Sequence, residues 1–267
     1  IAIPLLLERL GVEAVKIHCE PNGQFPHNPE PLKQHLTDLS EKVVSSHADF
    51  GIAVDPDVDR LAFMDEKGIM FGEEYTLVAC ADYILSQRPG NTVSNLSSTR
   101  ALRDVTEKHG GTYTASAVGE VNVVNAMKAT NAVIGGEGNG GIIYPESHYG
   151  RDALVGVALF LSLLAERKIA VSELRASYPS YFMSKKKIDL NPSIDVDAIL
   201  VAMEAKYAHE QISTIDGVKI DFASEWVHLR KSNTEAIIRI YTEAPSQEKA
   251  DVLADKIIDE IKKVAGL

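Results

Sequence analysis

An acidic loop between two apolar segments constrains this sequence more than any other feature. Asp55, Asp57 and Asp59 stand at alternate positions and Arg60 follows them, while the apolar runs on either side predict two strands. Three aspartates within five residues repel one another unless a cation neutralises them. Oxygen ligands on a short loop suit a hard divalent ion such as Mg²⁺ or Ca²⁺. The arginine is suited to hold a phosphate that the metal also contacts.

Two other structures fit parts of this pattern. A solvated turn is one alternative, since Asp and Pro are common in turns, although the aligned carboxylates and the arginine exceed what a turn requires. An EF-hand is the other, with Glu66 at the twelfth position of the loop. The sixth position of an EF-hand needs glycine, and here it is Arg60. Helices flank an EF-hand loop, whereas these flanks are predicted strands, so we reject the EF-hand.

Composition excludes several classes of protein. The chain has 267 residues, enough for two or three domains, and a formal charge of −11, which argues against a nucleic-acid binder. Cys19 and Cys80 give no disulfide framework, so we expect a reducing cytoplasmic location. The longest apolar run, 153–165, is too short to span a bilayer, and no signal peptide is visible. We therefore expect neither a nucleic-acid nor a membrane partner.

Periodicity divides the chain into three predicted domains. Residues 1–67 combine predicted helices at 1–10 and 31–46 with a predicted strand at 13–18 and the strands beside the acidic loop. In residues 68–179 strands alternate with helices, which indicates an α/β sheet, and residues 180–267 have several strands between two helices, which indicates a small α+β domain. We expect two α/β mixed-sheet domains followed by a smaller α+β domain.

The first residues suggest a truncated domain. The sequence opens in a predicted helix, with no initiator methionine and no helix cap. A βαβ unit that begins in this way has lost its first strand. We expect the first domain to be truncated at its N-terminus and the chain to be the later part of a longer protein.

A glycine-rich segment follows the predicted strand 132–135. Gly136 to Gly141 contain Glu137 and Asn139 at alternate positions, and a carboxylate with an amide suits the hydroxyls of a polyol such as a sugar. The order of glycines does not match a dinucleotide-binding fingerprint. A flexible hairpin turn is the alternative interpretation.

A second polar segment lies between apolar strands of the third predicted domain. Arg230, Ser232, Asn233 and Thr234 supply the donors of a phosphate cradle, in which arginine binds two oxygens and the hydroxyls and amide bind the rest. An exposed polar hairpin is the alternative.

Polar residues also gather before the predicted helix 152–167. Asp152 is expected to cap this helix. His148 and Arg151 stand beside it, and a loop histidine is more often solvated than part of a cleft.

Together, these loops resemble the α-D-phosphohexomutase superfamily, which includes phosphoglucomutase, phosphomannomutase and phosphoglucosamine mutase. The resemblance covers the whole chain and matches the later part of such an enzyme, whose members have three α/β domains and a smaller C-terminal domain. It implies that Asp55, Asp57 and Asp59 bind Mg²⁺ and that Arg60 helps position the transferring phosphate. It implies further that the remaining matched residues bind substrate, namely Glu137, Asn139, Arg230, Ser232, Asn233 and Thr234.

The resemblance also implies a reaction. A phosphoserine donates its phosphoryl group to a hexose phosphate, the resulting bisphosphate reorients, and the other phosphate returns to the serine. This chain departs from the family pattern in two places: no serine loop matches, so the chain alone is expected to be inactive, and Gly141 stands where many members have histidine. The expected substrate is the phosphate of glucosamine or mannose, and a non-catalytic sugar-phosphate-binding module is the rival interpretation.

Overall fold

The computed structural model describes residues 1–190, 194–232 and 237–266, so the predicted substrate residues Asn233 and Thr234 lie outside the described residues. Two units divide the chain. Unit 1 contains residues 1–115 and 119–178, and unit 2 contains residues 116–118 and 179–267. None of the helices in the described ranges is long and apolar enough to cross a membrane.

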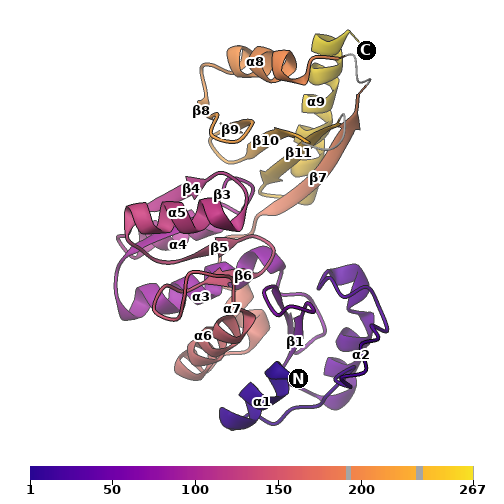
Figure 1. The fold of residues 1–267 in the computed structure, drawn as a ribbon, viewed down its shortest axis with the longest axis vertical. Coiled ribbons are helices and arrows are strands. Elements are labelled where there is room, and N and C mark those ends of the chain that lie inside the picture. Colours follow the sequence, from indigo (N-terminus) through magenta and orange to yellow (C-terminus); the bar gives the residue numbers. More distant parts are fainter. Residues whose placement is uncertain (191–193, 233–236, 267) are drawn as a thin grey trace. The chain divides into compact units, whose positions relative to one another are not determined.

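Unit 1 alternates helices with strands (Figure 1). Its helices are α1 (Ala2–Arg9), α2 (Thr37–Ser46), α3 (Glu73–Gln87), α4 (Ala101–Lys108), α5 (Glu120–Thr130), α6 (Ala153–Arg167) and α7 (Val171–Ala176), with a short 3-10 helix at Lys33–His35. Its strands are β1 (Phe50–Val54), β2 (Leu61–Asp65), β3 (Asn91–Asn95), β4 (Tyr113–Ser116), β5 (Ala132–Glu137) and β6 (Gly141–Ile143).

The strands of unit 1 form two sheets. β1 and β2 pair antiparallel, with Val54 opposite Leu61, so the acidic loop connects the two strands of a hairpin. The second sheet has the order β4-β3-β5-β6, in which β3 and β5 are parallel and β5 and β6 are antiparallel. Helix α5 packs against β3 and β5, while α3 packs against β5, β6 and α6 (Figure 1). The predicted α/β class is therefore confirmed.

Aromatic packing fixes β2 against α6. Phe63 of β2 stacks on Phe160 of α6 with ring centroids 3.8 Å apart, and Phe71 meets the same ring edge-on at 5.1 Å. All three side chains are fully buried. Burial of aromatic rings of this size stabilises the contact by several kcal/mol, on the order of 2–3 per ring. The strand that follows the acidic loop is thus held rigidly.

A buried polar network ties the helices of unit 1 together. Asp82 of α3 is 1 % exposed and accepts hydrogen bonds from His109 at 2.8 Å, Arg167 at 2.5 Å and Tyr178 at 2.9 Å. Burial opposes ionisation of this carboxyl, but the bonds from His109 and Tyr178 and the charge of Arg167 prevail and lower the pKa of Asp82. The network is a structural feature of unit 1, outside the candidate site.

Unit 2 is a five-stranded antiparallel sheet covered by helices. The strands are β7 (Phe182–Asp189), β8 (Gln211–Ser213), β9 (Val218–Asp221), β10 (Trp226–Lys231) and β11 (Ile237–Ala244), in the order β7-β11-β10-β9-β8. The helices are α8 (Val196–Lys206) and α9 (Gln247–Ala265). Apolar residues of both helices and of the sheet form one core, so the α+β prediction for this part of the chain is confirmed.

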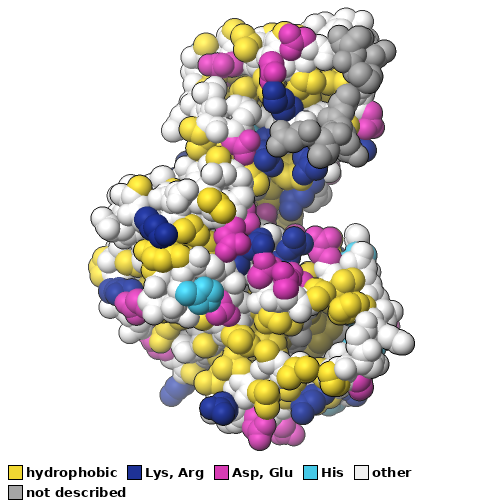
Figure 2. All heavy atoms as spheres, in the orientation of Figure 1, with side chains coloured by type: hydrophobic (Ala, Val, Ile, Leu, Met, Phe, Trp, Pro, Cys, Tyr) yellow, Lys and Arg dark blue, Asp and Glu magenta, His cyan; other side chains and the backbone are white. Residues whose placement is uncertain are grey.

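The helix predicted at 31–46 is divided into the 3-10 helix and α2, and the strand predicted at 13–18 is wrong. Residues 13–18 form no strand, and Val15 is 54 % exposed. A strand needs a neighbour for its backbone hydrogen bonds, and β1 pairs only with β2 among the described residues. On the face shown in Figure 2, apolar side chains lie over the part of unit 1 that contains α1 and α2. Ile1, Leu5 and Val44 are among the exposed apolar residues of these segments.

The buried histidine of β10 predicts a pH dependence for unit 2. His228 is 1 % exposed and its Nε2 contacts the backbone oxygen of Asp216 at 2.6 Å. Burial disfavours the imidazolium and lowers the pKa from 6.5 to about 4, although the bond to Asp216 opposes the shift. The unfolded chain therefore binds a proton that the folded unit excludes, and unit 2 should lose up to about 3 kcal/mol of stability as pH falls from 6.5 towards 4.

Urea unfolding followed by the fluorescence of Trp226 measures this effect, because the chain has one tryptophan and it is buried in unit 2. A His228→Gln variant should unfold with a much weaker dependence on pH in the same window. An equal pH dependence in both proteins would contradict the assignment.

Candidate metal and sugar-phosphate site

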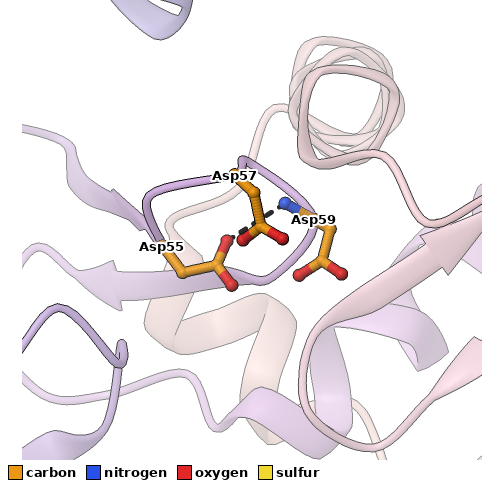
Figure 3. A group of neighbouring side chains, drawn as sticks. All are labelled: Asp55, Asp57 and Asp59. Carbon is orange, nitrogen blue, oxygen red and sulfur yellow. Dashed lines mark hydrogen bonds between the residues drawn. The ribbon is translucent and has the colours of Figure 1, made fainter.

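Three carboxylates converge at the tip of the β1–β2 hairpin. One ligand oxygen from each of Asp55, Asp57 and Asp59 lies within 4.8 Å of the others. Figure 3 shows the three side chains turned towards one another from a single loop. Asp55 is buried, Asp59 is half-buried and Asp57 is exposed. The structure therefore brings the predicted metal ligands together with one open side.

Backbone amides fix the shape of this loop. The amides of Asp59 and Arg60 donate to Oδ1 of Asp55 at 3.0 and 2.9 Å, and the first of these bonds is drawn in Figure 3. Val58 adopts a left-handed conformation with φ of 61°. This conformation is unfavourable for a β-branched residue, so surrounding contacts must hold it. One such contact is the amide of Ala153, which donates to the oxygen of Val58 at 3.0 Å.

Arg60 lies directly beside the carboxylates. Its Nη1 donates to Glu30 at 2.9 Å, and its Nε lies 3.7 Å from Asp55 and 3.9 Å from Asp59. The Nε atom is buried and has no hydrogen-bond partner among the described residues. A buried donor without a partner is costly unless a ligand satisfies it. The Arg60 side chain as a whole is 34% exposed, so its guanidinium can also contact an anion bound at the loop.

These residues fit a hard divalent cation. The donor set consists of carboxylate oxygens only, which is the set that Mg²⁺ prefers, and the exposed side leaves room for water or a substrate oxygen. The flanking elements are strands, which agrees with our rejection of an EF-hand.

The glycine-rich segment forms a tight hairpin between β5 and β6. Glu137 is the last residue of β5 and pairs with Gly141 of β6. Its Oε1 accepts from the amide group of Asn95 at 2.8 Å and from the backbone of Gly119 at 3.1 Å. The Oδ1 of Asn139 accepts from the backbone of Gly141 at 3.1 Å. The two predicted sugar-binding residues therefore lie at the tip of one hairpin, with Glu137 buried and Asn139 half-buried.

Close packing requires glycine at position 140 of this hairpin. Gly140 has φ of 83°, and a Cβ atom there would lie 2.0 Å from the backbone oxygen of Leu61, at the start of β2. The absence of a side chain at this position lets the β5–β6 hairpin pack directly against the β1–β2 hairpin. After the ligands predicted for them, the β5–β6 hairpin is called the sugar hairpin and the β1–β2 hairpin the metal hairpin.

Arg151 connects the two hairpins, and the sequence did not identify it as a site residue. Its Nη1 donates to Oε2 of Glu137 at 3.0 Å, and its Nη2 donates to Oδ2 of Asp59. The neighbouring Asp152 accepts from the amides of Leu154 and Val155, so its prediction as the cap of α6 is confirmed. Ion-pair partners far apart in sequence carry no local signal, and the only hint was the polar cluster before α6.

The predicted phosphate loop belongs to unit 2. Arg230 lies near the end of β10, and Ser232 follows it, with its amide donating to the oxygen of Ile237 at 3.1 Å. The Nε of Arg230 lies 3.0 Å from the carboxylate of Asp216, which also accepts from the backbone of Val118 at 2.9 Å. Asp216 was not singled out from the sequence, because a turn residue before glycine is common.

Family models match successive parts of the chain. Their descriptions are phosphoglucomutase/phosphomannomutase alpha/beta/alpha domain II for residues 2–68, alpha/beta/alpha domain III for residues 71–181, and the C-terminal domain for residues 185–260. The boundaries that we predicted at 67/68 and 179/180 remain a prediction.

Individual proteins that resemble this chain carry the same family names. The chain is 34% identical over 263 residues to a probable phosphoglucosamine mutase of Methanopyrus kandleri, covering 97% of this chain and 58% of that protein. It is 35% identical over 268 residues to a phosphoglucomutase/phosphomannomutase of Thermococcus kodakarensis, covering 98% and 59%. A crystal structure of a phosphoglucomutase/phosphomannomutase family protein from Burkholderia thailandensis superposes with a TM-score of 0.86 at 26% identity, covering 99% of this chain and 58% of that one. The chain thus spans less than two thirds of the length of these relatives.

Removal of one exposed carboxylate tests the metal loop. Asp57→Ala should weaken Mg²⁺ binding at least tenfold, on the order of the effect of losing even an outer-shell partner. The fold should be preserved, because Asp57 is exposed, whereas Asp55 also accepts the backbone bonds that shape the loop. Isothermal titration with Mg²⁺ measures the affinity, and Glu41→Ala, an exposed carboxylate of α2, is the matched control. Equal affinities in the two variants would contradict a metal site at this loop.

Proposed function

The chain belongs to the phosphoglucomutase/phosphomannomutase family of phosphohexomutases, and we propose that it forms the metal-, sugar- and phosphate-binding part of an enzyme that interconverts hexose 6-phosphate and hexose 1-phosphate. We further propose three domains, at 1–67, 68–179 and 180–267. The observation that best supports the function is the meeting of the acidic hairpin and the Glu137 hairpin within unit 1. A divalent ion and a sugar hydroxyl can be bound side by side there.

The acidic hairpin serves phosphoryl transfer in this proposal. Asp55, Asp57 and Asp59 would hold Mg²⁺, which supplies charge neutralisation for the transferring phosphoryl group when it is bound. Arg60 would orient that group through the exposed part of its guanidinium, which lies beside the carboxylates. Positioning and electrostatic stabilisation provide most of the catalysis in reactions of this class.

The other two loops hold the substrate in this proposal. Glu137 and Asn139 would bind sugar hydroxyls from the hairpin tip, where a carboxylate accepts hydrogen bonds and an amide both donates and accepts them. Arg230 and Ser232, with Asn233 and Thr234, would bind the phosphate that is not reacting. Binding energy from that remote phosphate is available to align the reacting end.

The proposed substrates are the phosphates of glucosamine and mannose. Relatives named as phosphoglucosamine mutases and as phosphoglucomutase/phosphomannomutase support this choice.

We propose that turnover needs a phosphoserine segment in addition to the residues of this chain, because no serine loop of that kind is present in the sequence. We also propose a cytoplasmic location, which suits the two free cysteines, Cys19 and Cys80.

A turnover assay separates the enzyme from a non-catalytic binding module. The full-length gene product should interconvert the 6-phosphate and 1-phosphate of glucosamine or mannose, and Asp57→Ala should abolish this activity. Binding of the same hexose phosphates should persist in the variant, because Glu137 and Arg230 are unchanged. Binding without turnover in the unsubstituted full-length protein would favour the module.

Arg230 provides a test of the phosphate loop. Arg230→Ala should weaken binding of glucosamine 6-phosphate roughly tenfold to 100-fold, since a charge-assisted bidentate contact contributes about 1.5–3 kcal/mol. Lys231→Ala is the matched control, because Lys231 is exposed and pairs with Asp197 at 2.7 Å. Titration calorimetry with the sugar phosphate measures both. An unchanged affinity in the Arg230 variant, or an equal loss in both variants, would contradict the assignment of Arg230 to the phosphate.

A further inference from the structure

The guanidinium of Arg151 lies between the two hairpins of the proposed site. Its Nη2 donates to Asp59 of the metal hairpin, its Nη1 donates to Glu137 of the sugar hairpin at 3.0 Å, and its Nε lies 3.4 Å from Glu120 at the start of α5. The side chain is 16% exposed. A single cation is therefore shared by carboxylates from three elements.

The main chain of Arg151 is held by its own hydrogen bonds. Its amide donates to Oε1 of Glu120 at 3.0 Å, and Arg151 forms an isolated antiparallel bridge with Ile143 of β6. The next residue, Asp152, donates its amide to the oxygen of Ile142 at 2.8 Å and caps α6. The guanidinium thus extends from a fixed main chain. A shift of one hairpin would move the guanidinium, and the guanidinium would in turn move the other hairpin.

Gly141 makes room for the arginine. A Cβ atom on Gly141 would lie 2.4 Å from Cδ of Arg151 and 3.0 Å from its Cγ. A side chain at position 141 and the observed path of Arg151 exclude each other. The glycine at the end of the sugar hairpin and the arginine ten residues later therefore act as a matched pair.

Electrostatics favours a positioning role over direct substrate binding. Carboxylates accept from both terminal nitrogens of Arg151, and a third lies 3.4 Å from its Nε, so a phosphate approaching this guanidinium would meet three anions. Removing the cation would leave Glu137 and Glu120 as neighbouring anions, and Asp59 would keep only the more distant charge of Arg60, whose Nε lies 3.9 Å away. Removing one partner of a buried ion pair leaves the other charge uncompensated, and this is strongly unfavourable.

We propose that Arg151 is a positioning residue that locks the metal hairpin and the sugar hairpin into one arrangement by sharing its guanidinium between Asp59 and Glu137. Its importance for catalysis rests on the proposed function, whereas the coupling of the two hairpins does not. Movement of either hairpin must change the other through the same guanidinium. A purely local structural role would affect each hairpin separately.

Amide hydrogen exchange measured by NMR without metal tests the coupling. The amides of Asp59 and Arg60 report on the metal hairpin, since both donate to Asp55, and the amide of Gly141 reports on the sugar hairpin, since it donates to Asn139. Arg151→Met keeps the bulk of the stem and removes the donors. It should accelerate exchange about tenfold in both hairpins together.

A double-substitution cycle then isolates the shared guanidinium. Glu137→Gln should accelerate exchange at Asp59 and Arg60 in the unsubstituted protein and have no such effect when Arg151→Met is already present. An equal effect of Glu137→Gln in both backgrounds overturns the proposal. Arg88→Met is the matched control, because Arg88 pairs with the exposed Glu146 in the same unit, and it should leave both hairpins unchanged.

A second variant and a Mg²⁺ titration keep the test decisive if Arg151→Met fails to fold or if only one of the two proposals is correct. If Arg151→Met does not fold, Arg151→Lys replaces it in the cycle, because lysine keeps the charge and loses the fork that reaches two carboxylates. Titration with Mg²⁺ separates the two proposals. Coupled exchange without Mg²⁺ binding refutes the metal site and supports the positioning role, whereas Mg²⁺ binding with uncoupled exchange refutes the positioning role and supports the metal site.

Discussion

Unit 1 depends on the neutralisation of carboxylates that are packed closely at the tips of two hairpins. Asp55 is balanced by backbone amides of its own loop, and Asp59 and Glu137 are balanced by Arg151. Arg60 adds a second positive charge. Carboxylates still outnumber guanidinium groups, so the site carries excess negative charge that a divalent cation would reduce. The open side at Asp57 is where such an ion can enter.

The need to bring these charged groups close together also explains the glycines and the aromatic packing around the site. Ion pairs such as that of Arg151 with Asp59 form only if the hairpins approach closely, and Gly140 allows the sugar hairpin to contact the backbone of Leu61. The stacking of Phe63 on Phe160 fixes β2 against α6, whose first residue, Ala153, also donates to the metal loop. Apolar packing therefore sets the distances at which the charges can be satisfied.

Local patterns in the sequence predicted the two strands beside the acidic loop, and the glycine-rich segment is a hairpin, which we gave as the alternative to a sugar-binding loop. The helix predicted at 152–167 is found as α6, Ala153–Arg167, because helix formation there follows from the composition of the segment itself. The strand predicted at 13–18 is wrong, because a strand also needs a partner that the segment itself does not contain. Arg151 was overlooked as a site residue for a related reason: its partners Asp59 and Glu137 are 92 and 14 residues away. The residue types of the candidate site were therefore predictable from the sequence, whereas the contacts between those residues were not.

In unit 2, Arg230 already has a carboxylate partner, and this affects which anions it can bind. Arg230 already lies beside Asp216, whose backbone oxygen contacts the buried His228. In the proposed function, an incoming phosphate must compete with a carboxylate that is held in place, so binding depends on how much more strongly Arg230 binds phosphate than it binds Asp216. Phosphate carries more charge and more acceptor oxygens than a carboxylate, which favours the exchange. The displaced carboxylate still accepts from the backbone of Val118, so the exchange leaves it with a hydrogen-bond donor.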